Sequence, residues 1–284
     1  MIGNGSSGIQ AITEIAKTAP LLNIFQRTAN YVVPAHNRHL NPQEVADIKS
    51  NYSTLREKAK ETYSGNIFES GGPSALAVSV DERIAEYESR WNNGGLCFMA
   101  AYDDLQSNTE ANRTAAEFIE NKIREIVKDK KTADKLIPKN SFGCKRLCVA
   151  SGYYETFNLP NVNLVDLNEN PLKRVTNNSI NAGDTEYKTD LIVLATGFDA
   201  MTGALNKINI SGINGSLKEK WETGPKSYLG LMSHNFPNMF TITGPGSPSV
   251  LTNMMTSIEQ HVEWISTCLE YMKNNKFTCI EPHL

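Results

Sequence analysis

The spacing of apolar residues changes several times along the chain, and each change predicts a different kind of element. Near the beginning, Ile9, Ile12 and Ile15 recur at helical spacing, and Pro20 predicts that this helix has ended. The apolar run over residues 21–27 then predicts a buried strand. A helix followed by a buried strand is typical of one half of a βαβ unit.

Residues 41 to about 135 show helical patterns and no evident strand. Capping signals open three predicted helices: Asn41 with Glu44, Ser79 with Glu82, and Ser107 with Glu110. After the first signal the apolar residues keep to one face as far as Ala59, so a single helix is expected there. The lysines within residues 128–135 are interpreted as a solvated face. We therefore interpret residues 41–140 as a helical insertion.

Strand patterns return from about residue 144, and the chain closes on a long helical pattern. Strands are predicted over residues 162–165, 172–175 and 190–195. The last of these is a continuous apolar run, so it is expected to be buried on both faces. After the glycine- and proline-rich turn of residues 244–249, one face of the predicted helix carries Ile258, Val262, Ile265, Leu269 and Met272.

Composition and charge mainly exclude classes of function. The 284 residues are 40% apolar and 21% charged, as in ordinary globular proteins, and the net charge of −3 argues against a nucleic-acid or anionic membrane partner. No apolar run approaches the roughly 18 residues of a membrane-spanning helix, and no secretory signal is evident. The cysteines are odd in number and scattered along the sequence, which is typical of a reducing cytoplasm and argues against disulfides and a zinc site. They are Cys97, Cys144, Cys148, Cys268 and Cys279.

A Gly-x-Gly-x-x-Gly motif stands at the start of the chain, over residues 3–8. In a dinucleotide-binding unit the first glycine permits a tight turn, the second lets the backbone approach a pyrophosphate, and the third lets helix and strand pack closely. A strand normally leads into this turn, but only Met1 and Ile2 precede it here. Either the motif is a coincidence or the chain begins inside a larger protein, and we favour the second interpretation.

The end of the strand after the motif indicates which nucleotide binds. An NAD site usually has Asp or Glu about 20 residues after the turn, whereas this chain has Arg27 and Thr28. A cation and a hydroxyl suit a 2′-phosphate, so NADP is expected rather than NAD. A second basic pair, Lys145–Arg146, could reach the same nucleotide from another loop. The alternative for each basic group is an ordinary exposed surface residue.

Several longer blocks of sequence together resemble one family. These blocks cover residues 25–34, 143–148, 153–158, 195–205, 244–254 and 257–262. In their order and in the residues they contain, these blocks closely resemble the flavin-containing Baeyer–Villiger monooxygenases of the cyclohexanone monooxygenase type. The resemblance covers nearly the whole chain and is weakest in the helical insertion. The α/β fold that it implies has a Rossmann-like NADP-binding domain with a helical insertion and the C-terminal portion of a Rossmann-like FAD-binding domain.

The resemblance implies a reaction and a set of site residues. NADPH reduces FAD, the reduced flavin takes up O2, and one oxygen is inserted into a ketone to give an ester or lactone. Arg146 matches the family's catalytic arginine, which stabilises the anionic oxygen adduct of the flavin and holds the nicotinamide. The other matches are the pyrophosphate turn (Gly3, Asn4, Gly5, Ser6, Ser7, Gly8 and Gln10), the 2′-phosphate site (Arg27, Thr28 and Lys145), a flavin contact (Met254) and the substrate pocket (Ser249, Val250 and Leu251).

Departures from the family's pattern limit these expectations. The implied domains are an NADP-binding domain over residues 1–40 and 141–188, the insertion over 41–140, and a partial FAD-binding domain over 189–284. The family's FAD-binding glycine motif and its C-terminal closing region are not found, so the chain is expected to be a fragment that is inactive alone. An exposed sheet edge and an exposed apolar face should follow. The alternatives are an NADP-binding module without catalysis, or a flavin monooxygenase that oxidises nitrogen or sulfur.

Overall fold

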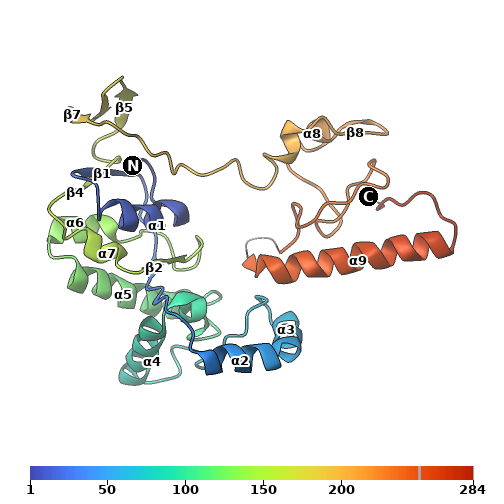
Figure 1. Cartoon of the computed structure of the whole chain (residues 1–284), viewed down its shortest axis with the longest axis horizontal. Coiled ribbons are helices and arrows are strands. Elements are labelled where there is room, and N and C mark those ends of the chain that lie inside the picture. Colours follow the sequence, from blue (N-terminus) through green and yellow to red (C-terminus); the bar gives the residue numbers. More distant parts are fainter. Residues whose placement is uncertain (249–250, 284) are drawn as a thin grey trace. The chain divides into compact units, whose positions relative to one another are not determined.

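The computed structural model describes residues 1–248 and 251–283 (Figure 1). Contacts divide the chain into two compact units. The first unit contains Met1–His39 and Phe68–Gly197, and the second contains Leu40–Ile67 and Phe198–Leu284. The expected helical insertion is therefore shared between the units, because residues 40–67 cluster with the second and residues 68–140 with the first.

The first unit is built around short parallel strands. Strand β1 (Leu22–Gln26) pairs in parallel with β4 (Val162–Asp166), and β2 (Val32–Val33) pairs in parallel with β3 (Cys148–Val149). Ile2 forms parallel bridges to both Phe25 and Leu194, so the start of the chain lies between β1 and residues 193–195. The two residues before the glycine motif thus occupy the position of the expected strand.

The prediction for residues 190–195 was wrong. Within the described residues this segment forms one bridge, at Leu194, and no strand. Leu191 is 75% exposed and Leu194 is 69% exposed, so the segment is not buried on both faces. Ile2 exchanges backbone hydrogen bonds with Val193 and Ala195. Ile192, Val193 and Ala195 are partly buried against neighbouring hydrophobic clusters, so the segment is covered only in part.

Helices cover the parallel strands of the first unit. They are α1 (Ser6–Ile15), α4 (Val80–Asn93), η1 (Gly95–Ala100, a 3₁₀-helix), α5 (Thr109–Ile126), α6 (Lys130–Leu136) and α7 (Tyr153–Thr156). Their core is aromatic: the ring of Tyr87 lies 5.5 Å from the rings of Phe98 and Phe118, centroid to centroid. A separate antiparallel sheet contains β5 (Leu172–Val175), β6 (Ser179–Ala182) and β7 (Thr185–Lys188), and β5 confirms a predicted strand.

Two of the three capping predictions are confirmed and one is wrong. Asn41 and Ser79 both form the predicted reciprocal capping boxes with Glu44 and Glu82. Helix α5 begins one residue later than predicted, because the Asn108 side chain accepts hydrogen bonds from the backbone N–H groups of its first turn. A side-chain amide oxygen at that position satisfies two otherwise unpaired donors.

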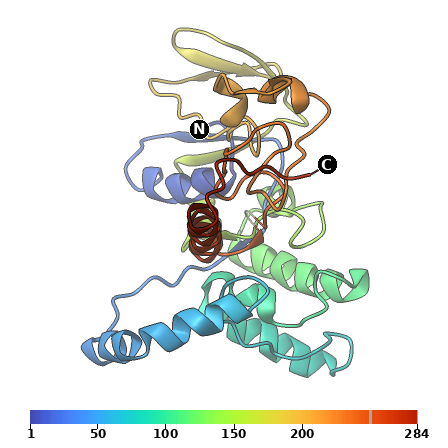
Figure 2. The same ribbon diagram turned by 90° about the vertical axis from the view of Figure 1, so that its right-hand side faces the viewer.

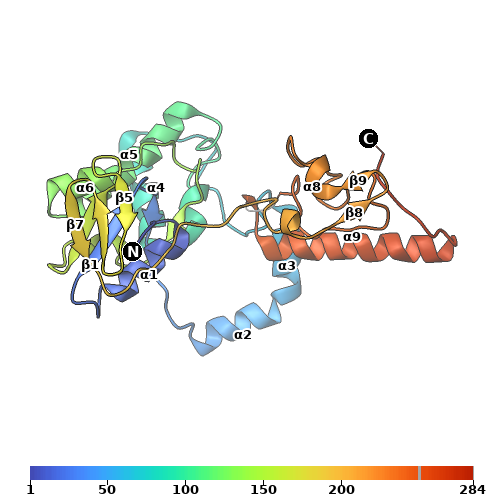
Figure 3. The same ribbon diagram turned by 90° about the horizontal axis from the view of Figure 1, so that it is seen from above.

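The single helix expected after Asn41 is two helices, α2 (Pro42–Ser50) and α3 (Tyr52–Glu61), which Figure 3 shows running in different directions. Asn51 lies between them, and its side-chain Nδ2 donates to the carbonyl of Asp47 at 3.0 Å. An asparagine side chain that bonds the backbone in this way competes with the helical pattern. Apolar periodicity continued through the break and therefore did not reveal it.

The second unit contains α2, α3 and the long helix α9 (Met254–Asn274), which is seen along its length in Figure 1 and end-on in Figure 2. The remaining elements are η2 (Leu205–Lys207), β8 (Ser211–Gly212), β9 (Gly215–Ser216) and α8 (Leu217–Lys220). Arg56 of α3 pairs with Glu259 of α9 at 2.6 Å. Helix α9 confirms the predicted long helix, although Val262 and Leu269 on its predicted apolar face are exposed.

The described residues contain neither a membrane-spanning helix nor a metal-binding cluster. No helix in that part of the chain is both long enough and apolar enough to cross a membrane. No group of His, Cys, Asp or Glu side chains there could hold a metal ion.

Candidate nucleotide-binding site

The three glycines of the motif differ in what surrounds them. Gly3 has a positive φ of 95°, and a Cβ added there would lie 2.4 Å from the carbonyl oxygen of Ala195. A Cβ at Gly8 would lie 2.6 Å from the carbonyl oxygen of Gly3, whereas a Cβ at Gly5 would meet nothing within 4 Å. Gly3 and Gly8 are thus required by the turn and its packing, and Gly5 faces open space where a ligand can approach the backbone.

Helix α1 begins directly at this open position. Gly5 is its N-cap residue, and no side chain caps the first turn. The amide groups at the start of the helix are therefore free to bind an anion, and the helix dipole favours negative charge there. This arrangement has the chemistry of a pyrophosphate site.

Side chains hold the turn against its neighbours. Gln10 Nε2 donates to the carbonyl of Val149 in β3 at 3.1 Å, and Asn30 Nδ2 donates to the carbonyl of Asn4 at 2.8 Å. Asn4 is itself buried, and its Nδ2 donates to Gln26 Oε1 at 2.6 Å. Gln10 and Asn4, both predicted as site residues, thus tie the turn to the surrounding strands.

Three basic residues carry positive charges that no carboxylate of the described residues neutralises. Arg27 follows β1 directly, and its side chain is exposed while its carbonyl accepts a 2.7 Å hydrogen bond from Asn168 Nδ2. Lys145 and Arg146, also exposed, precede β3. Among the residues described, no carboxylate pairs with any of these three cations, so each is available to an anionic ligand.

Cys148 connects the second basic pair with the turn. Burial raises the pKa of the Cys148 thiol above its ordinary value, while the positive charge of Arg146 and a hydrogen bond with the Ser6 side chain partly oppose that shift. The thiol therefore stays protonated near neutral pH. Arg146, Cys148 and Ser6 are close neighbours, which brings the Lys145–Arg146 loop near the start of α1.

The structure brings some predicted site residues together and not others. The Arg27–Thr28 loop adjoins the turn through Asn4, and the Lys145–Arg146 loop adjoins it through Ser6. Within residues 1–248 and 251–283, no hydrogen bond joins one basic loop to the other. Of the remaining predicted residues, Met254 begins α9 in the second unit and Leu251 is exposed, while Ser249 and Val250 lie outside the described residues.

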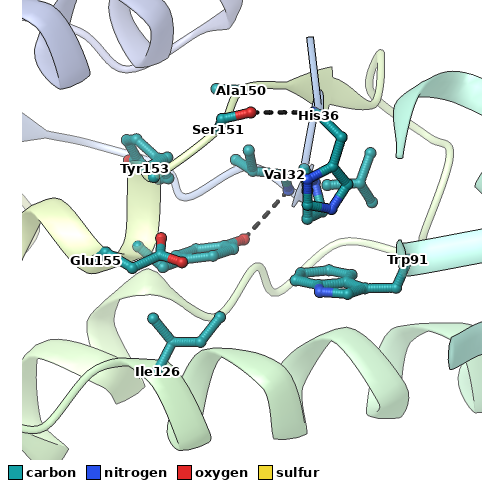
Figure 4. Close-up of a pocket in the computed structure, with 12 residues that line it drawn as sticks. Val32, His36, Trp91, Ile126, Ala150, Ser151, Tyr153 and Glu155 are labelled. Atoms are coloured by element: carbon teal, nitrogen blue, oxygen red, sulfur yellow. Dashed lines mark hydrogen bonds between the residues drawn. The ribbon is translucent and has the colours of Figure 1, made fainter. Parts of the chain in front are cut away.

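The sequence did not predict a pocket of about 120 Å³ in the first unit (Figure 4). It lies where β2 and β3 end, and the carboxyl ends of parallel strands are a common place for ligands. His36 and Trp91 stand on one side of it and Glu155 on the other, and the hydroxyl of Ser151 accepts from the backbone N–H of His36 at 3.1 Å. The small residues Ala150, Ser151 and Gly152, which follow β3, were the sequence signal that could have indicated it.

Comparison with known proteins shows which proteins this chain is similar to. No protein-family model matches the chain. It is 41% identical over 286 residues to cyclohexanone 1,2-monooxygenase of Acinetobacter sp, and 38% identical over 286 residues to a Baeyer–Villiger monooxygenase of Pseudooceanicola batsensis. It is also 40% identical over 285 residues to phenazine N-monooxygenase PhzNO1 of Lysobacter antibioticus. Each match covers 99% of this chain and 52% of the relative.

The chain is similar over nearly its whole length to about half of several Baeyer–Villiger and related monooxygenases.

Solved structures of related monooxygenases have the same fold as this chain. It is similar to an oxidized steroid monooxygenase bound to NADP, with a TM-score of 0.94 and 46% identity, over 99% of this chain and 54% of that one. It is similar to OTEMO in complex with FAD and NADP, with a TM-score of 0.97 and 38% identity, over the same shares of each chain. The expected α/β class with Rossmann-like domains is confirmed, and the chain spans about half the length of the proteins it matches.

Proposed function

We propose that this chain is the NADPH-binding part of a flavin-dependent monooxygenase that inserts one oxygen atom of O2 into a ketone, giving an ester or lactone. The names of the cyclohexanone and Baeyer–Villiger relatives support the reaction. The similar structures with NADP, or with FAD and NADP, support the two cofactors. Since the relatives are about twice as long, the reaction is proposed for the whole protein, and the chain alone is expected to bind nucleotide without turnover.

The observation that carries this proposal is the open backbone at Gly5, beside an uncapped helix and two loops of unpaired cations. The pyrophosphate of NADPH would lie against residues 3–8, because free amides at the start of α1 meet open space there. Arg27, Thr28 and Lys145 would hold the 2′-phosphate, and the absence of an acidic residue beside Arg27 favours NADPH over NADH. The residues present therefore fit this cofactor.

NADPH and FAD would supply the redox chemistry, and the chain's own residues bind and orient. Arg146 carries a positive charge that no described carboxylate neutralises. A cation beside a reacting group stabilises the negative charge that develops on that group. Arg146 is for this reason our choice as the catalytic residue of the chain.

The case for FAD rests on the relatives rather than on a cradle in this chain. The sequence contains one Gly-x-Gly-x-x-Gly motif, and that motif is assigned to NADPH. Met254 is proposed as a flavin contact, and Ser249, Val250 and Leu251 as lining for the substrate, because they match the family at those positions. The assignment of residues 189–284 to a partial FAD-binding domain is likewise a proposal.

Titration of the purified chain with NADP⁺ and with NAD⁺ in a calorimeter tests the nucleotide site. We expect NADP⁺ to bind more tightly than NAD⁺, and Arg27→Ala to weaken NADP⁺ binding by about tenfold to a hundredfold because a charge-assisted contact is lost. Arg174→Ala is the matched control, since Arg174 is an exposed arginine on β5, outside the loops beside the turn. Equal affinity for the two nucleotides would overturn the assignment of NADP.

One relative favours a second candidate reaction, oxidation of nitrogen, because phenazine N-monooxygenase is about as similar to the chain as cyclohexanone monooxygenase is. Incubation of the whole protein with FAD and NADPH plus either cyclohexanone or phenazine, followed by mass spectrometry, separates the candidates. A lactone supports the ketone reaction, and an N-oxide supports the second candidate. Nucleotide binding without either product is the expected behaviour of a binding module.

The cellular setting is also proposed from the chemistry of the chain. All five cysteines are free, which supports a reducing cytoplasm. The net charge of −3 supports small-molecule partners, a ketone and O2, over nucleic acid or a membrane surface. The complementary flavin-binding segment of the family is the proposed protein partner.

A further inference from the structure

We propose that Asn4 is a positioning residue that fixes the Arg27–Thr28 loop relative to the glycine turn and thereby sets the preference for NADPH over NADH. This inference rests on the proposed function and deepens it. Asn4 lies inside the glycine turn and is only 5% exposed, so its side chain does not face the ligand. Its polar groups are used instead to hold the residues on both sides of Arg27 and Thr28.

Asn4 anchors the loop at both ends. On the side before Arg27, Asn4 Nδ2 donates to Gln26 Oε1 at 2.6 Å. On the side after Thr28, Asn30 Nδ2 donates to the Asn4 carbonyl at 2.8 Å. Residues 27–29 therefore form a short loop whose two flanks are fixed to one residue of the turn.

The donor and the acceptor of the buried bond between Asn4 and Gln26 can be assigned from the other bond that Gln26 makes. Gln26, 2% exposed, donates from Nε2 to the carbonyl of Lys135 at 2.7 Å, and a carbonyl can only accept. Gln26 Oε1 must then accept from Asn4 Nδ2. The Asn4 side chain also contacts Tyr153: burial raises the pKa of Tyr153, and a hydrogen bond with the Asn4 side chain partly opposes that shift.

This network is complete without any ligand. Asn168 adds a further bond, to the carbonyl of Arg27 at 2.7 Å, while the Arg27 side chain stays exposed and unpaired among the described residues. The backbone of the loop is thus fixed before binding, and the side chains that would meet a 2′-phosphate are left free. Fixing a binding group in advance reduces the ordering cost of binding.

Two variants test the inference by cutting the anchors without touching Arg27 or Thr28. Gln26→Leu removes the bond before the loop, and Asn30→Ala removes the bond after it. The matched control is Asn163→Ala, which removes a 3.1 Å bond from Asn163 to Asn23 on the same pair of strands, away from the turn. NADP⁺ and NAD⁺ are titrated into each purified full chain, and circular dichroism checks that each variant is folded.

We expect both anchor variants to bind NADP⁺ about tenfold more weakly while NAD⁺ binding changes less than about twofold, because NAD⁺ has no 2′-phosphate to misplace. Asn163→Ala should leave both affinities unchanged. If Gln26→Leu does not fold, Asn30→Ala decides, since Asn30 is only partly buried. An unchanged NADP⁺/NAD⁺ ratio in the folded anchor variants, with the ratio lowered in Arg27→Ala, would overturn the positioning role alone. An unchanged ratio in Arg27→Ala would overturn the proposed site and this inference with it.

Discussion

Helices α1 and α9 start from similar sequence patterns and reach opposite degrees of burial. In the first unit, the 10-residue α1 buries Ile9 and Ile12 completely. In the second unit, the 21-residue α9 leaves Val262 44% exposed and Leu269 49% exposed. Apolar periodicity therefore predicts a helix and its apolar face, but burial of that face depends on which element packs against it.

The largest expected effect is on the free energy of unfolding, when an aliphatic side chain is truncated to alanine in each of the two helices. Ile12→Ala should lower the free energy of unfolding by about 3–4 kcal/mol, because it leaves a cavity in a closed core. Val262→Ala should lower it by less than about 1 kcal/mol, because that side chain already meets solvent. Urea unfolding followed by circular dichroism measures both. Similar losses in the two variants would show that α9 is packed as tightly as α1 and would end the comparison.

A smaller effect separates packing from binding at the start of α1. Gly3→Ala should cost about 2–3 kcal/mol, because the new Cβ would clash with the Ala195 carbonyl and φ is positive there. Gly5→Ala should leave stability within about 0.5 kcal/mol, since nothing lies within 4 Å of its Cβ. It should nonetheless weaken NADP⁺ binding, because the methyl group would occupy the open position. Chemical unfolding and calorimetric titration of both variants check this, and unchanged binding in Gly5→Ala would contradict a pyrophosphate site there.

The smallest effect concerns the buried part of α9. His261 Nδ1 accepts a hydrogen bond from the backbone N–H of Thr243 at 2.9 Å, and burial lowers the pKa of His261 from its ordinary 6.5. The unfolded state therefore binds a proton more readily than the folded state, and stability falls as the pH drops below about 6.5. His261→Gln keeps an acceptor without titrating, so it should lose this part of the pH dependence. Unfolding curves at pH 7.5 and 5.5 compare the two proteins, and equal slopes would show that His261 does not contribute.

Features that depend on local signals could be predicted from the sequence. The glycine turn, β1 and the capping boxes of Asn41 and Ser79 each require particular residues within a few positions, and the structure has them. The break at Asn51 was missed because a side-chain hydrogen bond interrupts a helix whose apolar face continues. The start of α5 was misplaced because adjacent Ser and Asn residues can both cap, and the amide of Asn108 does so.

Features that join distant segments could not be predicted in this way. Pattern analysis placed residues 190–195 in a buried strand, but the run of apolar residues contains no information about whether a neighbour is present. The pocket of Figure 4 is lined by His36, Trp91 and Glu155, which come from three separate stretches of sequence. For the same reason Asn4 was identified only as part of a motif, and its bond to Gln26 was not foreseen.

The two anchors around Arg27 and Thr28 also limit how nucleotide preference can evolve. Only three positions separate Gln26 from Asn30, and both ends are tied to the same turn. An insertion or deletion between them would break an anchor, so loop length is not a free variable. If the proposed 2′-phosphate site is right, a descendant that came to use NADH would change the side chains of Arg27, Thr28 and Lys145, while the segment between the anchors kept a constant length.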